Sequence, residues 1–223
     1  MWRDTWLMAG KDLRIEARSR VALSQVAPFG IVALVLFAFA LGPDRAPMAK
    51  GAPGLFWVAM LFSSVLAIQR SVSVESADGA RDGLRLSGLD PAGQFLGKTL
   101  SVAAQLLVLE VVLGVGVVLL YGASIATFWL IAVSCLLGTL GLAAAGTLYG
   151  ALSAGLRIKE TLLPFLLLPV VAPVLLAGTR MWQAALSGGT PSNGTPWFHL
   201  LIAFDAVYLA LGVVVYGPIQ ETA

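Results

Sequence analysis

The chain has 223 residues, of which 58% are hydrophobic and only 12% are charged. Soluble domains carry roughly 25% charged residues, so this composition excludes a soluble globular protein and predicts an integral membrane protein. The net charge of +2, with the basic residues spread among loops and not gathered on one face, gives no indication of nucleic-acid binding.

Residues 1–20 mix tryptophan and aliphatic side chains with cations, and eight of these residues are charged. No long apolar segment stands close to the first residue, so we expect no cleaved signal sequence. The mixture of apolar and cationic side chains is typical of an amphipathic helix that lies in a membrane interface. A poorly ordered basic tail is the alternative interpretation.

Six apolar segments follow, each close to the ~20 residues that cross about 30 Å of hydrocarbon. They are predicted at 21–42, 53–69, 99–121, 125–153, 161–178 and 197–217. The fourth segment contains Gly146 and Gly150, a spacing that lets two helices pack closely. The fifth contains three prolines and is expected to be kinked.

The distribution of Lys and Arg predicts the orientation, because cytoplasmic loops of membrane proteins are enriched in these residues. Eleven of the 14 lie on the side that holds the N terminus, whereas Arg45, Lys50 and Arg180 lie on the other. Both termini are therefore expected in the cytoplasm, together with a polar coupling loop at 70–98. The loop at 179–196 is expected outside.

These patterns together predict an all-α integral membrane protein with six transmembrane helices. An amphipathic elbow helix occupies 1–20, the transmembrane domain covers 21–217, and 218–223 form a cytoplasmic tail.

The interval from Gln69 to Lys98 holds eight of the 26 charged residues. A loop this polar is the expected docking place for a soluble partner, since little else of the chain reaches water. A short cytoplasmic helix from Val74 to Leu89 could present apolar and charged side chains together to a groove on that partner. Its contact residues would be Leu84, Leu86, Leu89, Asp78, Asp82 and Arg85. A solvated connector is the alternative.

Residues 92–99, AGQFLGKT, nearly match the phosphate-binding pattern G-x-x-x-x-G-K-[ST]. Ala92 stands at the first glycine position, no strand precedes the motif, and the segment that follows enters the membrane. Nucleotide binding is therefore not expected here. Lys98 is interpreted as an interfacial anchor at the foot of the third span.

Two carboxyl groups, Glu110 and Asp205, lie within the third and sixth spans, where ionisable groups are costly. At ~1.5 Å per residue, Glu110 lies roughly 17 Å from the start of its span and Asp205 about 12 Å from the opposite side. Their depths nearly coincide, so they could form a proton or substrate site. Alternatively, each is a protonated carboxyl that hydrogen-bonds an adjacent helix.

The chain contains one histidine and one cysteine, which is too few for a hydrolase or metalloenzyme site. His199 follows two aromatic residues and is interpreted as an interface residue rather than a haem ligand. Cys135 is interpreted as a small buried hydrophobe. Trp57, Trp129 and Trp182 are interpreted as interface residues.

Three blocks of sequence occur in order: GPD…APGLFWVAMLFSSVLAIQRS, ESADGARDGLRLSGLDPAGQFLGKTL and LLGTLGLAAAGTLYGALSAGLRIKETLLPFLLLPVVAPVLLAGT. In combination, over about residues 11–180, they resemble CcmB, the membrane subunit of the cytochrome c maturation ABC transporter. The resemblance implies a non-catalytic permease in the bacterial inner membrane that pairs with a separate ATPase, CcmA, which binds Mg-ATP.

The resemblance also implies further partners: the haem-handling subunit CcmC, the small subunit CcmD and the haem chaperone CcmE. In that family the ATPase cycle is tied to release of the haem-loaded chaperone, so haem is handled by the complex and no cofactor is expected on this chain. The complex could hold two copies of the chain.

The family's loop pattern, acidic-x-x-acidic-Gly-x-x-x-x-Leu, falls here on Glu75, Asp78, Gly79 and Leu84. Its later elements fall on Ser87, Pro91, Gly97 and Lys98. Many relatives carry Phe and further acids after the second span, whereas this chain has Arg70-Ser-Val-Ser-Val. The residues expected to couple to the ATPase are Glu75, Asp78, Gly79, Asp82, Leu84, Leu86 and Pro91.

Two other functions remain open on the sequence. A generic ABC exporter permease for another small amphiphile would share this architecture. An ion-coupled membrane carrier or a membrane-embedded enzyme would depend on Glu110 and Asp205.

Overall fold

The computed structural model of this chain describes residues 1–20, 22–42, 44–76, 88–123, 125–154, 159–187 and 194–222. Nearly all of the described residues are helical, and no strand occurs among them. The elements are α1 (Trp2–Ser19), the π-helical turn η1 (Ala22–Val26), α2 (Ala27–Leu41), α3 (Arg45–Ser76), α5 (Pro91–Tyr121), α6 (Phe128–Ala154), α7 (Lys159–Leu186) and α8 (Thr195–Thr222).

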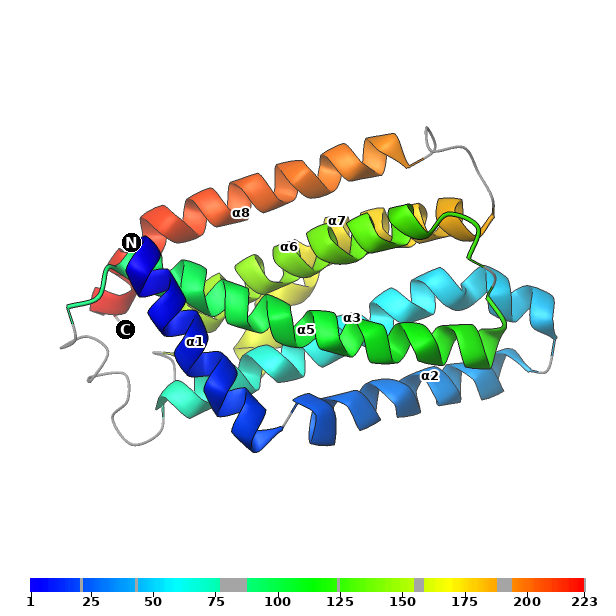
Figure 1. Cartoon of the computed structure of the whole chain (residues 1–223), viewed down its shortest axis with the longest axis horizontal. Coiled ribbons are helices and arrows are strands. Elements are labelled where there is room, and N and C mark those ends of the chain that lie inside the picture. The colour runs from blue at the N-terminus through cyan, green and yellow to red at the C-terminus, as the bar shows by residue number, and fades with distance from the viewer. Residues whose placement is uncertain are drawn as a thin grey trace.

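Six of these helices are long and apolar enough to cross a membrane. The candidate spans are Ser24–Leu41, Ala46–Ser73, Pro91–Tyr121, Phe128–Ser153, Leu162–Leu186 and Thr195–Gln220. They run side by side along the long axis of the molecule (Figure 1). The predicted all-α membrane protein with six transmembrane helices is therefore confirmed.

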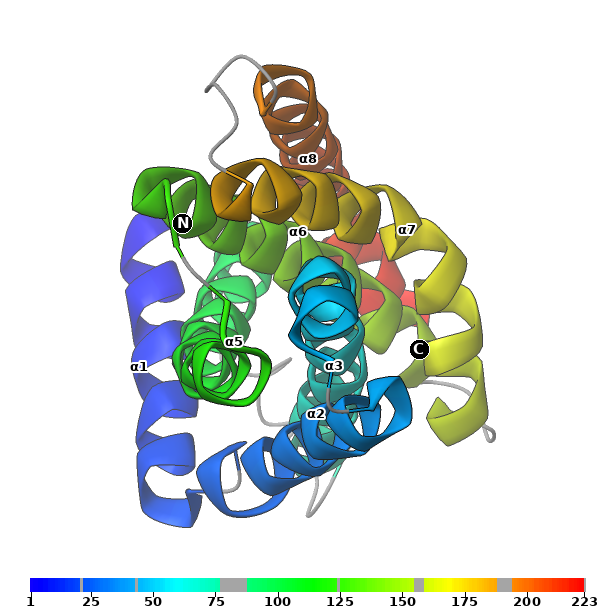
Figure 2. The same cartoon turned by 90° about the vertical axis from the view of Figure 1, so that its right-hand side faces the viewer.

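Helix α1 does not join this bundle but runs across one end of it, as the end-on view in Figure 2 shows. Both chain termini lie at this same end, which we name the α1 end (Figure 1). The other end, where α2 leads to α3, α5 to α6 and α7 to α8, is named the far end. An even number of crossings requires both termini on one side, as the charge distribution predicts.

Four helices extend beyond the predicted apolar segments, because polar flanking residues continue the same helices. One of them, α8, runs on to Thr222, through residues predicted as the cytoplasmic tail. Helix α3 starts at Arg45, and α5 starts at Pro91. Helix α7 runs on to Leu186, so the first part of the loop predicted at 179–196 is helical. Membrane-spanning helices commonly continue past the apolar region of the bilayer. The apolar segments of a sequence mark only the part of each helix inside that region.

Helices α3 and α6 make close contacts toward the ends of both helices. A Cβ atom added at Gly150 would lie 3.0 Å from Val72 Cγ2, and one added at Gly146 would collide with Ile68. The pair Gly146 and Gly150 thus lets α3 approach α6 closely, as its spacing predicts.

The interpretation of Trp57 and Trp182 as interface residues is wrong. They are only 1% and 4% exposed, and both belong to the core of the bundle. The indole of Trp57 lies against Gly138 of α6 and Gly178 of α7, where the missing side chains make room for it. Trp129, in contrast, is exposed.

Candidate coupling site at the α1 end

The start of α5 is fixed by strong local signals. Gly88 has a φ of +64°, a left-handed conformation that favours glycine. The Asp90 side chain caps the helix by accepting a hydrogen bond from the backbone N–H of Ala92 at 3.2 Å. Pro91 occupies the first helical position, where its missing N–H has no cost. The polar loop therefore enters α5 in a defined direction.

Helix α1 packs directly on the first two turns of α5. A Cβ atom added at Gly93 would lie 2.8 Å from the carbonyl oxygen of Met1. One added at Gly97 would lie 2.7 Å from Met8 Cβ. Carbon atoms in van der Waals contact are about 3.5–4.0 Å apart, so the two helices could not approach this closely with side chains at these positions.

This contact gives the AGQFLGKT segment its structural meaning. Gly93 and Gly97 stand four residues apart on one face of α5, a spacing that permits close helix packing. The segment that resembles a phosphate-binding loop is thus a surface for α1. Its Lys98 is only 4% exposed, so its side chain is covered by protein rather than reaching the headgroups as an anchor would.

Polar contacts at the N terminus add to this packing. The Asp4 carboxylate accepts a hydrogen bond from the backbone N–H of Asp90 at 3.3 Å. The amino group of Met1 lies 3.5 Å from Asp4 Oδ2 and 3.4 Å from Asp90 Oδ2. Exposed ion pairs of this kind contribute little stability, about 0–1 kcal/mol, so we assign them the role of setting the register of α1 on α5.

The end of α8 completes the site. The Gln94 side chain donates a hydrogen bond to the Leu89 carbonyl at 3.0 Å and accepts one from Gln220 Nε2 at 3.0 Å. The next residue, Phe95, is fully buried, and its ring centre lies 5.6 Å from that of Tyr216, one turn before Gln220 on α8. Helices α1 and α8 and the end of the polar loop therefore meet on the foot of α5.

The helix predicted over 1–20 is confirmed, and its two faces differ. Thr5, Met8 and Ala9 are buried against the bundle. The opposite face exposes Trp2 and Trp6, at 70% and 68%, together with further apolar side chains and cations. These include Leu7, Leu13, Ile15, Arg14 and Arg18. Apolar and cationic side chains on one exposed face are what interfacial helices present to lipid.

Most residues expected to contact the ATPase fall outside the described residues. These are Asp78, Gly79, Asp82, Leu84 and Leu86. Glu75 lies in the last turn of α3, and Pro91 lies at the start of α5. Where the predicted helix 74–89 overlaps the described residues, 74–76 continue α3 and Gly88 and Leu89 are not helical. Both ends of the loop lie at the α1 end (Figure 1).

The two intramembrane carboxyl groups are buried, but they face different sides of α6. Glu110 lies beside Cys135 and Thr139. Asp205 lies against Gly141, where an added Cβ atom would be 2.7 Å from Asp Oδ1. Residues 139 and 141 are about 200° apart around a helix, so α6 stands between the two carboxyl groups.

Among the described residues, the Asp205 carboxyl has no hydrogen-bond partner, whereas Glu110 lies beside the hydrogen-bonding groups of Thr139 and Cys135 on the adjacent helix α6. Because α6 separates the two groups, the common site that their similar depths suggested is not formed in this structure.

His199 is exposed beside Phe198, with ring centroids 5.7 Å apart. In the part of the chain that the structure describes, no three His, Cys, Asp or Glu side chains gather to hold a metal ion.

The family profile described as CcmB protein matches residues 3–217, from the start of α1 to the last turns of α8. The chain belongs to the CcmB family. The resemblance seen in the sequence is thereby confirmed, and it extends beyond residue 180 to include α8.

Several curated relatives carry the name heme exporter protein B. The protein of Paracoccus denitrificans is 31% identical over 185 residues, which cover 81% of this chain and 83% of the relative. That of Bradyrhizobium diazoefficiens is 31% identical over 206 residues, covering 91% and 90%. That of Pseudomonas aeruginosa is 30% identical over 205 residues, covering 92% and 90%. The likeness thus spans nearly the whole fold of each protein.

The contact between α1 and α5 was not predicted, although the sequence contains a signal for it. The Gly93 and Gly97 pair has the same spacing as Gly146 and Gly150, but together with Lys98 it also fits the end of a nucleotide-binding motif. Nothing in the sequence identified α1 as the helix that would cover this pair.

Proposed function

We propose that this chain is the permease subunit of an ABC-type haem export complex that serves cytochrome c biogenesis in the bacterial inner membrane. A separate CcmA-like ATPase would bind at the α1 end, which we place in the cytoplasm. Subunits like CcmC and CcmD and a chaperone like CcmE would complete the assembly, which could hold two copies of this chain. Membership of the CcmB family, with its relatives named heme exporter protein B, is the observation that carries this proposal.

The packing at the α1 end supports a mechanical role for this region. The polar loop leads into α5 at the point where α1 and α8 are attached to it. A force applied to the loop or to α1 would therefore act on the foot of α5. The chain itself would need no catalytic residues, because ATP hydrolysis would take place in the partner.

Helix α5 is a suitable element to carry such a movement across the membrane. Its 31 residues give a length of roughly 46 Å at about 1.5 Å per residue. Near its last turn, the buried hydroxyl of Tyr121 donates a hydrogen bond to the Leu34 carbonyl of α2 at 2.7 Å. A tilt of α5 driven by ATPase closure would thus move the far end, where we expect the haem-handling partners to bind.

Charge reversal in the loop tests the proposal. In Asp78→Lys/Asp82→Lys, we expect loss of co-purification with a co-expressed CcmA-like ATPase and loss of holocytochrome c, while the chain still inserts in the membrane. Asp44→Lys, at the far end, is the control and should retain both. Undiminished co-purification of the double variant would contradict docking at this loop.

The same assays separate the alternatives. A generic exporter would associate with an ATPase, but its loss would leave holocytochrome c unchanged. An ion-coupled carrier would function without the ATPase. The separation of Glu110 and Asp205 by α6 gives the carrier alternative no shared site on which to operate.

A further inference from the structure

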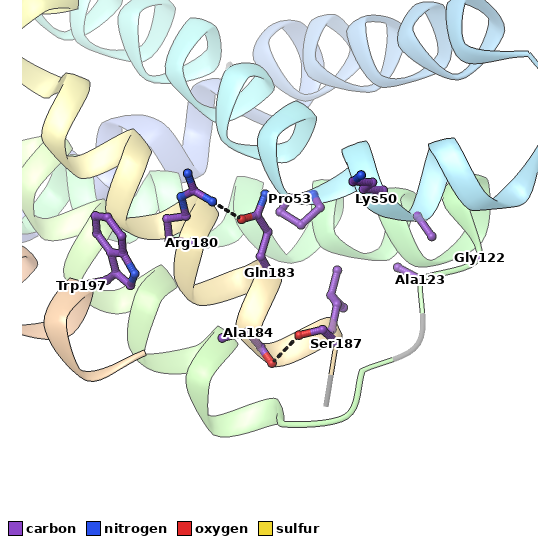
Figure 3. Close-up of a pocket in the computed structure, with 11 residues that line it drawn as sticks. Lys50, Pro53, Gly122, Ala123, Arg180, Gln183, Ala184, Ser187 and Trp197 are labelled. Carbon is purple, nitrogen blue, oxygen red and sulfur yellow. Dashed lines mark hydrogen bonds between the residues drawn. The ribbon is translucent and has the colours of Figure 1, made fainter. Parts of the chain in front are cut away.

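The far end of the bundle holds a pocket of about 640 Å³. Its walls come from the first turns of α3, the segment after α5, the last turns of α7 and the start of α8. Pockets that bind small molecules commonly measure about 300–1,000 Å³, so this one can accept a ligand of that kind. Figure 3 shows Lys50, Arg180, Gln183 and Trp197 among the residues around it.

The charged side chains among the described residues that line this pocket are all cationic. Lys50 and Arg180 both line it and are exposed, whereas no acidic side chain occurs among its described lining residues. Neither cation forms a salt bridge within the described part of the chain. Cations are sparse on the outer side of membrane proteins, where we expect the far end to lie. Two cations that line one pocket without a counter-charge therefore mark a site for an anion.

Arg180 is held in position for such a role. Its guanidinium donates a hydrogen bond to Gln183 Oε1 at 3.2 Å and lies 6.0 Å from the ring centre of Trp197. A guanidinium carries five N–H donors, so this single bond leaves donors for a carboxylate or a phosphate. Figure 3 shows Arg180 and Lys50 on either side of Gln183 and Pro53.

The rest of the lining is mainly apolar and includes the indole of Trp197, Pro53 and Leu186. Cations beside apolar and aromatic walls suit a molecule with acidic groups on a hydrophobic body. We propose that this pocket binds an amphiphilic anion at the far-end membrane surface, with its carboxylate or phosphate groups on Lys50 and Arg180.

If the proposed function holds, haem is one such anion, since it carries two carboxylates on an apolar ring. No His, Cys or Met occurs among the described residues that line the pocket. The chain would then grip haem by its acidic groups and leave the iron free for a protein that supplies an axial ligand. An anionic lipid, held through its phosphate, is the other source of the same chemistry.

The pocket also adjoins the helix that leads from the coupling site. Gly122 and Ala123, directly after α5, form part of its lining. The backbone N–H groups of Ala126 and Thr127 donate to the Ala185 carbonyl of α7 at 3.2 and 3.1 Å. A tilt of α5 would therefore change the shape of the pocket, and its affinity for the anion would vary with the state of the ATPase.

Binding to the full chain in phosphatidylcholine nanodiscs tests this site. Zinc protoporphyrin IX is titrated in and followed by its fluorescence anisotropy, with its dimethyl ester in parallel. We expect Lys50→Gln/Arg180→Gln to weaken binding of the free acid at least tenfold and to leave binding of the ester unchanged. The matched control Arg14→Gln/Arg18→Gln removes two exposed cations from α1 and should bind the free acid within twofold of wild type.

A second arm uses nanodiscs that contain phosphatidylglycerol. If lipid is the occupant, native mass spectrometry should find phosphatidylglycerol retained on the wild type and lost from Lys50→Gln/Arg180→Gln, and this lipid should compete with the porphyrin. Equal binding of both ligands by wild type and by this variant, at equal thermal stability, would overturn the proposal. Because no ATPase is present, that failure would leave the proposed coupling function untouched.

Discussion

The contact between α1 and α5 makes a sharp prediction for the substitution Gly97→Leu. A Cβ atom at this position would lie 2.7 Å from Met8 Cβ, about 1 Å inside normal carbon contact, and the rest of the leucine would intrude further. Overpacking of this kind typically costs about 1–3 kcal/mol. Leucine is a better helix former than glycine, so α5 itself should not be weakened. The loss of free energy should therefore weaken the packing of α1 against α5.

Hydrogen exchange of the α1 backbone amides, measured by mass spectrometry, reports how stably α1 packs on α5. A loss of about 2 kcal/mol corresponds to roughly 30-fold faster exchange of the α1 amides, at about 1.4 kcal/mol for each factor of ten. ATPase co-purification should fall in parallel, because α1 no longer reaches the foot of α5.

Gly114→Leu on the same helix is the matched control, because an added Cβ atom there meets nothing within 4 Å. Its α1 exchange and ATPase association should equal those of wild type. Unchanged α1 exchange in Gly97→Leu would contradict the conclusion that Gly93 and Gly97 allow α1 to pack on α5. Faster exchange with normal ATPase association would instead separate this packing from coupling.

Three further predictions concern the bundle. Tyr121→Phe removes the hydrogen bond to the Leu34 carbonyl and should lower stability by about 1 kcal/mol, seen as a lower thermal midpoint in detergent. Trp57→Ala leaves a cavity between three helices and should cost about 3–5 kcal/mol, with a correspondingly larger fall in the same assay. Glu110→Gln and Asp205→Asn should each support normal holocytochrome c at normal protein levels, because the two groups share no site; loss of function in both would restore the carrier alternative.

The fold could be predicted from the sequence because hydropathy and length identify spans directly. Hydropathy does not say where a helix ends once it leaves the apolar region, so the predicted second and third segments begin later in the chain than α3 and α5 do. It also does not say how a helix is rotated about its axis. Glu110 and Asp205 therefore had predictable depths but unpredictable directions, and Trp57 could not be recognised as a core residue before its glycine partners were known.

The sites depended on contacts between distant segments. The far-end pocket joins Lys50 to Arg180, and the coupling site joins Asp4 to Asp90, so no local pattern contains either. The family pattern did identify the loop that should receive the ATPase. The described residues at the two ends of that loop lie at the α1 end, and docking of the ATPase there stays a prediction.

Site-specific crosslinking tests the central proposal, that the α1 end receives the ATPase, most directly. A photoreactive amino acid replaces Asp82 in the loop or Lys50 at the far end, in cells that co-express the CcmA-like ATPase. Irradiation should yield an adduct between this chain and the ATPase from position 82 and none from position 50. An adduct from position 50, or none from position 82 at equal expression, would contradict the account.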